Sequence, residues 1–562
     1  MILEDKYLPK GVFFLRIHSV LSILIFGGAA FSICKGLIKN GNVFLIFAIL
    51  LLHPYFLDFF SLARGYAMSF AFQMLALALL LSFINKPKWY TPPIIALVCC
   101  FATLCNFSLL NFQLALLGIT LLFCLIQLYQ KIWSVKTFLL AILPGLLLTA
   151  LFFKKLLPLL FKMKSLGNFY YGGDSGFWEN TITSLAASLS YNSSTNNHTE
   201  LFIKFLVLSI FLSVPIWLLV KKERMNQVHW KKLIAVYCIL LLMIASTIIQ
   251  HYYLETLYLI ERTALLFLPV FLVITIVLLV NTRAIVLQLL LFVAVSFHFI
   301  TTVSASSVFE WKMNANNEKA ISMFNKIPPP EGRSQINLST SFEYYSVVKF
   351  YCLYYGVKKI APLHIKLNGI DAYGDYFMFS KKRKNEMKLP PIKEIYYDEV
   401  SDFVIAKRLQ PYQNKIISTH VMVLNNVVQP YNEQAIKSDT GWTMKPENMF
   451  SNGFKVILNA SNTKKNAFIE VDLLMKIDRP LTKEIGISYS AERGTLNLDY
   501  KYCELYSILN AQLGQWVHIK YAYPLPQPLK EGDVVSSFLF NNNAQYIAYK
   551  QFNMSLFYYQ NP

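Results

Sequence analysis

The first half of this chain has very few acidic side chains. Of the 32 Asp and Glu residues, nine precede residue 303 and 23 follow it, whereas the 52 Lys and Arg residues divide into 22 and 30. The net charge of the first part is therefore +13 (22 − 9), and that of the second is +7 (30 − 23), which together give +20. Long charge-free runs fill residues 1–302 and exclude an ordinary soluble domain there.

The sequence also lacks the motifs of several common enzyme classes. It contains no phosphate-cradling glycine loop, no Ser–His–Asp arrangement and no cluster with the spacing of metal ligands. Six of the eight cysteines lie in apolar runs, so the cysteines do not indicate a disulfide framework. The basic residues gather in short loops between apolar runs, which favours a membrane protein over a nucleic-acid-binding protein.

About ten segments are long and apolar enough to be transmembrane helices. The chain is 55% hydrophobic and has a mean hydropathy of +0.42. A helix needs about 20 mostly apolar residues to cross the hydrocarbon core of a bilayer. We expect spans near residues 12–34, 42–60, 65–84, 91–108, 110–129, 137–153, 201–220, 233–250, 263–281 and 284–302.

Lysine and arginine residues predict how these spans are oriented. They are concentrated in alternate short loops, around residues 35–39, 86–88, 131–136, 221–232 and 283, and such loops are usually cytoplasmic. The part of the chain after residue 302 then lies outside the cytoplasm. With ten spans Met1 lies outside too, so either the first helix translocates its amino end or, as we favour, another helix precedes this sequence.

The second part of the chain reads as two extramembrane domains. Residues 303–445 alternate helix-like and strand-like segments and predict a small α/β domain, with helices at 312–327 and 341–356 and strands at 334–339, 374–380 and 416–423. Residues 446–562 predict a jelly-roll-like antiparallel β-sandwich. Its strands are expected at 453–459, 466–476, 484–490, 496–508, 515–523, 534–541 and 545–558.

Charged residues at the edge of apolar runs mark the candidate functional site, because charge at that depth is costly. Asp58 and Arg64 lie six residues apart at a corner between two predicted spans. Arg64 could bind phosphate through two parallel hydrogen bonds, and Asp58 could orient a sugar hydroxyl or a metal ion. An Asp58–Arg64 pair that only locks the corner is an equal alternative. Gly65 and Tyr66 favour tight helix packing.

Two further regions could belong to the same site. Glu261 and Arg262 open the ninth predicted span, and Arg262 is either a second phosphate ligand or an interfacial arginine. The long loop 154–200 holds a stretch rich in glycine and aromatic residues that includes Asp174. It suits a mobile flap over a sugar or lipid, or a plain connection with a short interfacial helix.

Four segments resemble stretches of the bacterial polytopic GT-C superfamily of glycosyltransferases, in the branch of polyprenyl-phosphate-sugar-dependent mannosyl- and arabinosyltransferase-like enzymes. His53–Leu81 is similar to the family segment NP-x-LLDFFSLARGYG and its following helix. Three further family segments are similar to residues 15–21, 261–269 and 310–316. Together, the resemblance covers roughly residues 12–315.

The resemblance implies a polytopic helical membrane domain at residues 1–302, in a bacterial inner membrane. It implies transfer of a sugar from a polyprenyl-phosphate donor to an extracytoplasmic acceptor, which is a lipid-linked glycan, a cell-envelope glycan or a protein. Some members of the family use a divalent cation and others use no metal, and neither nucleic acid nor a further cofactor is expected.

The resemblance also assigns site residues. Asp58, Arg64 and Arg262 would line the donor phosphate site, with His53, Tyr66 and Glu261 as further substrate-binding candidates. The general base of the family is an Asp in the first outer loop, and this sequence has no Asp at that place. The remaining candidates for the base are Asp58, Asp174 and Asp5.

Two other classes of function remain open. The chain could be a non-catalytic or truncated membrane protein that presents a carbohydrate-binding β-sandwich. Aromatic residues of that domain, Trp516, Tyr521 and Tyr523, could stack on sugar rings, or they could be ordinary core and edge residues. The third possibility is a transporter of lipid-linked saccharide, for which repeats and interrupted helices would be typical.

Overall fold

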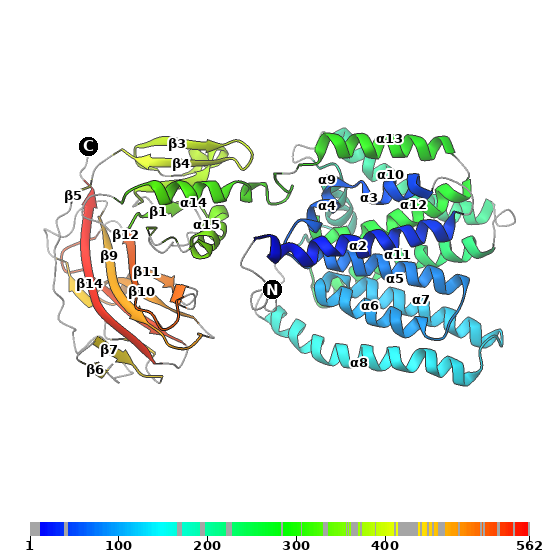
Figure 1. Cartoon of the computed structure of the whole chain (residues 1–562), viewed down its shortest axis with the longest axis horizontal. Coiled ribbons are helices and arrows are strands. Elements are labelled where there is room, and N and C mark those ends of the chain that lie inside the picture. The colour runs from blue at the N-terminus through cyan, green and yellow to red at the C-terminus, as the bar shows by residue number, and fades with distance from the viewer. Residues whose placement is uncertain are drawn as a thin grey trace. The chain divides into compact units, whose positions relative to one another are not determined.

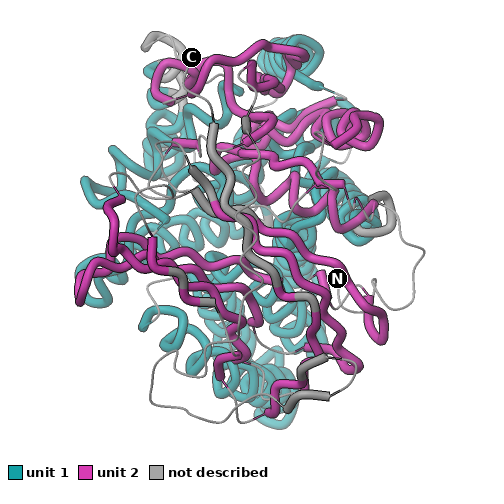
Figure 2. Tube along the Cα trace, turned by 90° about the vertical axis from the view of Figure 1, so that its left-hand side faces the viewer, with its two compact units in different colours: residues 1–304 teal, residues 305–562 magenta. Residues whose placement is uncertain are grey.

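The computed structural model divides the chain into two compact units, residues 1–304 and 305–562 (Figure 2). Each unit is described by itself below. The structure describes residues 12–38, 43–165, 171–191, 197–220, 227–282, 285–304, 306–329, 335–355, 357, 359–360, 369–370, 374–387, 389–409, 412–413, 436–438, 441–446, 449–451, 454–458, 467–481, 484–505, 508–509, 512–524, 529–542 and 546–559.

The first unit is built of helices (Figure 1). The α-helices are α2 (Val12–Leu37), α3 (Val43–Leu51), α4 (Pro54–Phe60), α5 (Tyr66–Asn85), α6 (Thr91–Cys105), α7 (Leu110–Tyr129), α8 (Val135–Ser165), α9 (Thr183–Leu189), α10 (Asn197–Val220), α11 (Gln227–Leu254), α12 (Leu268–Thr282) and α13 (Ile285–Thr302). Shorter helical turns are η1 (Phe107–Leu109), η2 (Phe177–Ile182) and η3 (Glu261–Phe267).

Several of these helices are long and apolar enough to indicate a multi-pass membrane protein. Within the described residues, seven meet the length and hydropathy of a membrane span, and the pair α3–α4 makes up to eight. α6 has only 15 residues, and the apolar helical stretch found in α10, Val207–Ile216, is also short. The expected count of ten spans therefore stays a prediction.

The span predicted at residues 42–60 is broken into two helices. α3 and α4 meet at an angle of 71° on either side of Leu52 and His53. Pro54, the first residue of α4, has no N–H to donate to the preceding turn, which favours a break in the helix at this point. His53 takes an extended conformation before α4. The break turns α4 and its carboxylate, Asp58, away from the direction of α3.

The second unit contains a four-stranded sheet with the order β1-β2-β4-β3. Strand β1 is parallel to β2, and the other neighbours are antiparallel. Buried apolar residues alternate along β2 and β4 between two clusters, so both faces of these strands are covered. The elements are α14 (Asn317–Lys326), β1 (Leu338–Thr340), α15 (Phe342–Tyr354), β2 (Tyr376–Ser380), η5 (Lys381–Glu386), β3 (Ile392–Asp398) and β4 (Phe403–Arg408), with η4 (Lys312–Asn314) before them.

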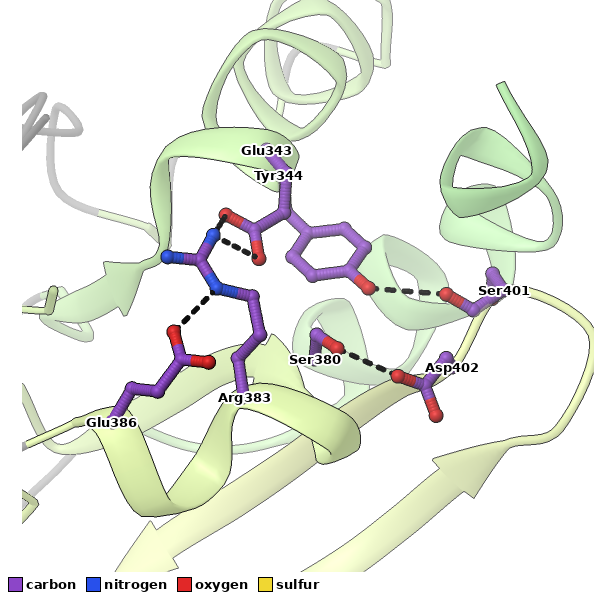
Figure 3. Close-up of polar contacts among 7 residues, drawn as sticks. All are labelled: Glu343, Tyr344, Ser380, Arg383, Glu386, Ser401 and Asp402. Atoms are coloured by element: carbon purple, nitrogen blue, oxygen red, sulfur yellow. Dashed lines mark hydrogen bonds and ion pairs between the residues drawn. The ribbon is translucent and has the colours of Figure 1, made fainter. Parts of the chain in front are cut away.

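Polar contacts hold the first turn of α15 (Figure 3). The hydroxyl of buried Tyr344 donates to the backbone carbonyl of Ser401 at 3.0 Å. Arg383 donates to Glu386 at 2.9 Å and to Glu343 at 3.4 Å. Since Arg383 and Glu386 are exposed, these ion pairs contribute little to stability, whereas the buried Tyr344 hydrogen bond contributes more.

The rest of the second unit is β-rich, and its two sheets are antiparallel. Their orders are β11-β10-β13-β8 and β12-β9-β14-β7-β6, with β5 also paired to β14. One cluster of buried residues takes side chains from both sheets, among them Leu473, Ile487 and Leu539. The strands are β5 (Tyr412–Gln413), β6 (Ile436–Ser438), β7 (Gly441–Met444), β8 (Phe454–Ile457), β9 (Ala467–Lys476), β10 (Ile485–Arg493), β11 (Leu496–Glu504), β12 (Val517–Pro524), β13 (Val534–Asn541) and β14 (Ile547–Tyr559).

Each of the seven strands predicted after residue 446 overlaps one of β8 to β14. Strands β6 and β7 join the sheet of β14 from before that residue. The strand predicted at 416–423 lies outside the described residues. The arrangement of the two sheets as a jelly-roll-like sandwich stays a prediction.

Candidate functional site

Asp58 lies on α4 and is buried, with 8% of its surface exposed. Its carboxylate oxygen Oδ2 accepts a hydrogen bond of 2.8 Å from the hydroxyl of Tyr191. Tyr191 is 133 residues away along the chain and follows α9. A buried carboxylate needs such a partner, because removing a charge from water is costly. The chain therefore holds Asp58 in one place through a contact between distant segments.

Arg64 lies in the turn between α4 and α5, where the sequence predicted a corner, and its side chain is exposed. The turn is fixed from α2, because the hydroxyl of Ser19 donates to the carbonyl of Arg64 at 3.2 Å. Gly65 follows, and a Cβ atom at that residue would lie 2.2 Å from the carbonyl oxygen of Cys105. Only glycine allows α5 to begin this close to the end of α6.

Tyr66, the first residue of α5, packs its ring against Phe59 at a centroid distance of 5.1 Å. This contact agrees with a packing role for Tyr66.

Glu261, Arg262 and Tyr171 form a second polar group. The hydroxyl of Tyr171 donates to the Glu261 carboxylate, and Nη1 of Arg262 donates to the same hydroxyl at 3.2 Å. The guanidinium of Arg262 also lies over the Tyr171 ring, with its central carbon 4.1 Å from the ring centroid. A stacked guanidinium keeps a fixed plane, which suits two parallel hydrogen bonds to a phosphate.

Glu261 itself stands at the first position of η3 with a left-handed backbone, at φ 47°. Its backbone N–H donates to the hydroxyl of Ser184 on α9. Side-chain contacts at this position therefore stabilise a conformation that non-glycine residues seldom adopt.

The segment Tyr171–Tyr191 is anchored to the chain that precedes η3. Gly173 and Tyr258 exchange two backbone hydrogen bonds, of 3.0 and 2.7 Å. A Cβ atom at Gly173 would lie 2.2 Å from the side-chain amide of Asn180, so a larger residue there would displace this amide. Burial, then the neighbouring Tyr252, raises the pKa of the Tyr258 phenol. Specific contacts with the chain before η3 therefore hold this segment in place.

This segment connects the two parts of the predicted site. At one end Tyr171 contacts Glu261 and Arg262, and at the other Tyr191 contacts Asp58. Between them, the carbonyl of Leu189 lies 3.1 Å from Nε2 of His298 on α13. α9 also packs against η3. Tyr191 and Ser184 could not be recognised from local sequence patterns, because both act through contacts with distant parts of the chain.

The other candidates have weaker connections to this group. His53 lies at the break between α3 and α4, with its ring centroid 6.5 Å from that of His298. Asp174 is exposed, and its carboxylate lies 3.5 Å from the Ser175 hydroxyl. Asp5 lies outside the described residues. In the part of the chain that the structure describes, no three His, Cys, Asp or Glu side chains gather as a metal site.

The aromatic residues of the C-terminal sheets differ in their surroundings. Tyr521 is fully buried in the core. Trp516 is 38% exposed, and the ammonium of Lys550 lies 4.3 Å from its ring centroid. The side chain of Tyr523 lies outside the described set. Tyr521 is therefore a core residue, and Trp516 already has a cation on its ring.

No known family model matches this chain, and no curated protein matches it either.

Proposed function

We propose that this protein is a membrane glycosyltransferase that moves a sugar from a polyprenyl-phosphate donor to an extracytoplasmic acceptor. The observation that supports this proposal most is the Tyr171–Tyr191 segment. It holds the buried carboxylate of Asp58 at one end and the stacked guanidinium of Arg262 at the other. A glycosyl transfer from a phosphate needs one group to accept a proton and cationic groups to stabilise the leaving phosphate.

In the proposed reaction the hydroxyl of the acceptor attacks the anomeric carbon of the donor sugar. The bond between that carbon and the phosphate oxygen breaks, and the polyprenyl phosphate leaves with the electron pair. A carboxylate takes the proton of the acceptor hydroxyl. Arg64 and Arg262 would stabilise the charge that grows on the phosphate, since charge-assisted hydrogen bonds are the strong ones.

Of the two candidates for the base that the structure describes, Asp58 is the stronger. It is buried and oriented by Tyr191, whereas Asp174 is exposed. The phenol hydrogen bond from Tyr191 orients this carboxylate, which would receive the proton. We therefore assign the proton transfer to Asp58 and no chemical role to Asp174.

The proposed surroundings of the site follow the charge pattern of the loops. We propose that the helical unit crosses a bacterial inner membrane up to ten times, and that residues after 302 lie outside the cytoplasm. The two antiparallel sheets would form a jelly-roll-like sandwich on that side. An acceptor glycan or protein would then meet the site from outside the cytoplasm.

One observation favours a second candidate, a transporter of lipid-linked saccharide. The broken pair α3–α4 places His53 and Asp58 at an interrupted span, as transporters often place their binding residues. The two functions differ in their product, because a transporter moves the donor across the bilayer without cleaving it.

The test is an assay of the full chain in proteoliposomes with a radiolabelled polyprenyl-phosphate sugar and a lipid acceptor fraction. We expect label in the acceptor, and Asp58→Asn should lower the transfer rate by at least about a hundredfold. Asp174→Asn is the matched control and should retain the rate. Label that crosses the bilayer on intact donor would support the transporter, and equal rates for Asp58→Asn and the wild type would refute our site.

A further inference from the structure

Helix α8 is longer than a membrane span. It has 31 residues, which at about 1.5 Å per residue make a rod of about 46 Å, whereas the hydrocarbon core is about 30 Å thick. About 20 residues from Val135 reach Lys154, so the remainder of α8 extends into the interfacial region. Figure 1 shows α8 at the margin of the helical unit, beside α6 and α7. Among its described side chains, only Ala141, Gly145 and Leu156 are buried.

The last third of α8 has a basic face. Lys154, Lys155 and Lys162 are all exposed, and at about 100° per residue they lie roughly 100° to 160° around the helix axis from buried Leu156. Within the described residues, no carboxylate lies within ion-pair distance of these three ammonium groups. We name the three residues the α8 lysine face.

Apolar residues next to the α8 lysine face are exposed as well. Leu157, Leu159 and Phe161 are 42%, 47% and 66% exposed. A basic helix with exposed Leu and Phe side chains is typical of a segment that lies in the headgroup layer, where the apolar side chains reach the acyl region and the cations meet phosphates.

The end of α11 that contacts α8 also indicates that the last third of α8 lies at the membrane–water interface. Lys164 donates a hydrogen bond of 2.8 Å to the carbonyl of Leu254, the last residue of α11. Tyr252 and Tyr253 precede that residue and are 75% and 82% exposed. Exposed tyrosines at the end of a span are typical of the membrane–water interface, so Lys164 lies at that level.

We propose that the α8 lysine face is a binding site for anionic phospholipid headgroups. The occupant is identified by charge complementarity: three ammonium groups without carboxylate partners stand where a bilayer presents phosphates. This surface would hold an annular lipid such as phosphatidylglycerol against α8, whichever side of the membrane it faces. The proposal does not depend on the glycosyltransferase assignment.

The experiment measures lipid retention. The full chain is taken from nanodiscs that contain equal phosphatidylglycerol and phosphatidylcholine, and the lipids that stay bound are counted by native mass spectrometry. The test variant is Lys154→Gln/Lys155→Gln/Lys162→Gln. Each lysine near an anionic surface is worth about fivefold in binding, so we expect the preference for phosphatidylglycerol to fall by at least about tenfold.

Two control variants make the result specific. Lys154→Arg/Lys155→Arg/Lys162→Arg keeps the charge and should keep the preference. Lys319→Gln/Lys326→Gln/Lys382→Gln removes three exposed lysines from the second unit and should also keep it. Free glycerophosphate at millimolar concentration should not displace the lipid, since the site includes the acyl-facing leucines.

Several outcomes would overturn the proposal. They are an unchanged lipid preference in the α8 variant, an equal loss in the second-unit control, displacement by free glycerophosphate, or crosslinks that place a second copy of the chain on α8. If the triple Gln variant does not insert, the three single Gln variants carry the test, each with about a fivefold expected loss.

Discussion

At the scale of single residues, Tyr171 and Tyr191 have the most consequence for the proposed chemistry. Each phenol donates a hydrogen bond to a carboxylate on another segment, Glu261 and Asp58 respectively. The ring of Tyr171 also supports the guanidinium of Arg262. A neutral phenol can orient a carboxylate by a hydrogen bond. These tyrosines therefore orient the carboxylates of Glu261 and Asp58 without changing the net charge of the site.

Removing the hydroxyl of Tyr191 tests this positioning role. In Tyr191→Phe the carboxylate of Asp58 loses its 2.8 Å donor while the ring remains in place. We expect the transfer rate to fall about tenfold and the free energy of unfolding to fall by about 1 kcal/mol. Transfer assays and thermal unfolding of the full chain measure the two effects.

The matched control is Tyr129→Phe, because Tyr129 is 89% exposed. The control should retain both the rate and the stability. A Tyr191→Phe protein with the wild-type rate would show that the contact with Asp58 serves only the fold.

The Arg493–Asp533 pair in the second unit predicts a pH-dependent stability. Arg493 donates two hydrogen bonds, of 2.7 and 2.8 Å, to the carboxylate of Asp533, which is 1% exposed. The hydrogen bond from Arg493 and the backbone N–H of Lys530 lower the pKa of this carboxyl against the opposing effect of burial. A lowered pKa in the folded state stabilises the fold above about pH 4 and loses this effect as the pH falls through the folded value.

We expect Arg493→Gln to lower the free energy of unfolding at pH 7, because it leaves the buried carboxylate of Asp533 without its guanidinium partner. The difference from the wild type should shrink as the pH falls through the lowered pKa of Asp533, because the carboxylate then becomes protonated. Denaturant unfolding of the full chain at a series of pH values measures the difference in the free energy of unfolding between the variant and the wild type. Arg479→Gln, at an exposed position, is the control; a loss that is the same at pH 3 and pH 7 would contradict the assigned cause.

At the scale of the elements, the approach of α5 to α6 shapes the corner that carries Arg64. Gly65 stands where a Cβ atom would meet the Cys105 carbonyl at 2.2 Å. We expect Gly65→Ala to lower the free energy of unfolding by about 2 kcal/mol, because the backbone of one helix must move. Thermal unfolding in nanodiscs measures the change.

Gly118→Ala is the matched control for that change. Gly118 lies within α7, and a Cβ atom there would meet nothing within 4 Å. Alanine favours the helix over glycine, so Gly118→Ala should be neutral or stabilising. If Gly65→Ala were equally harmless, the α5–α6 contact would not be as close as described.

Many elements could be predicted from the sequence, and the reasons are physical. Long apolar runs predicted the helices of the first unit, and alternating residues predicted β8 to β14, because both patterns are local. The break before Pro54 was not predicted, although proline supplies its cause. Strand β3 was also not predicted, since four of its seven residues are exposed and its apolar residues do not alternate regularly with polar ones.

The candidate site could be predicted only in part. The charges at Asp58, Arg64, Glu261 and Arg262 were visible as costly residues beside apolar runs. Tyr191 was not, because its contact with Asp58 spans 133 residues and follows from tertiary structure alone. The sequence predicted either a mobile flap or a plain connection within residues 154–200. In the structure, two backbone hydrogen bonds between Gly173 and Tyr258 hold this region.

At the scale of the whole molecule, the chain pairs a polytopic helical unit with a β-rich unit that has its own hydrophobic cores. The helical unit has few acids, so the buried carboxylate of Asp58 and the hydrogen-bonded carboxylate of Glu261 are prominent among its described residues. One segment of the same unit contacts both of them. Our central proposal is therefore that Arg262 binds the phosphate of the donor.

The most direct test of that claim is the affinity of the full chain in nanodiscs for polyprenyl phosphate without sugar, measured by calorimetry. We predict that Arg262→Gln weakens the affinity by about ten- to a hundredfold, since it removes a charge-assisted hydrogen bond. Arg262→Lys should weaken it less because the charge remains, and Asp58→Asn should not weaken it. An affinity that is unchanged in Arg262→Gln would contradict the account.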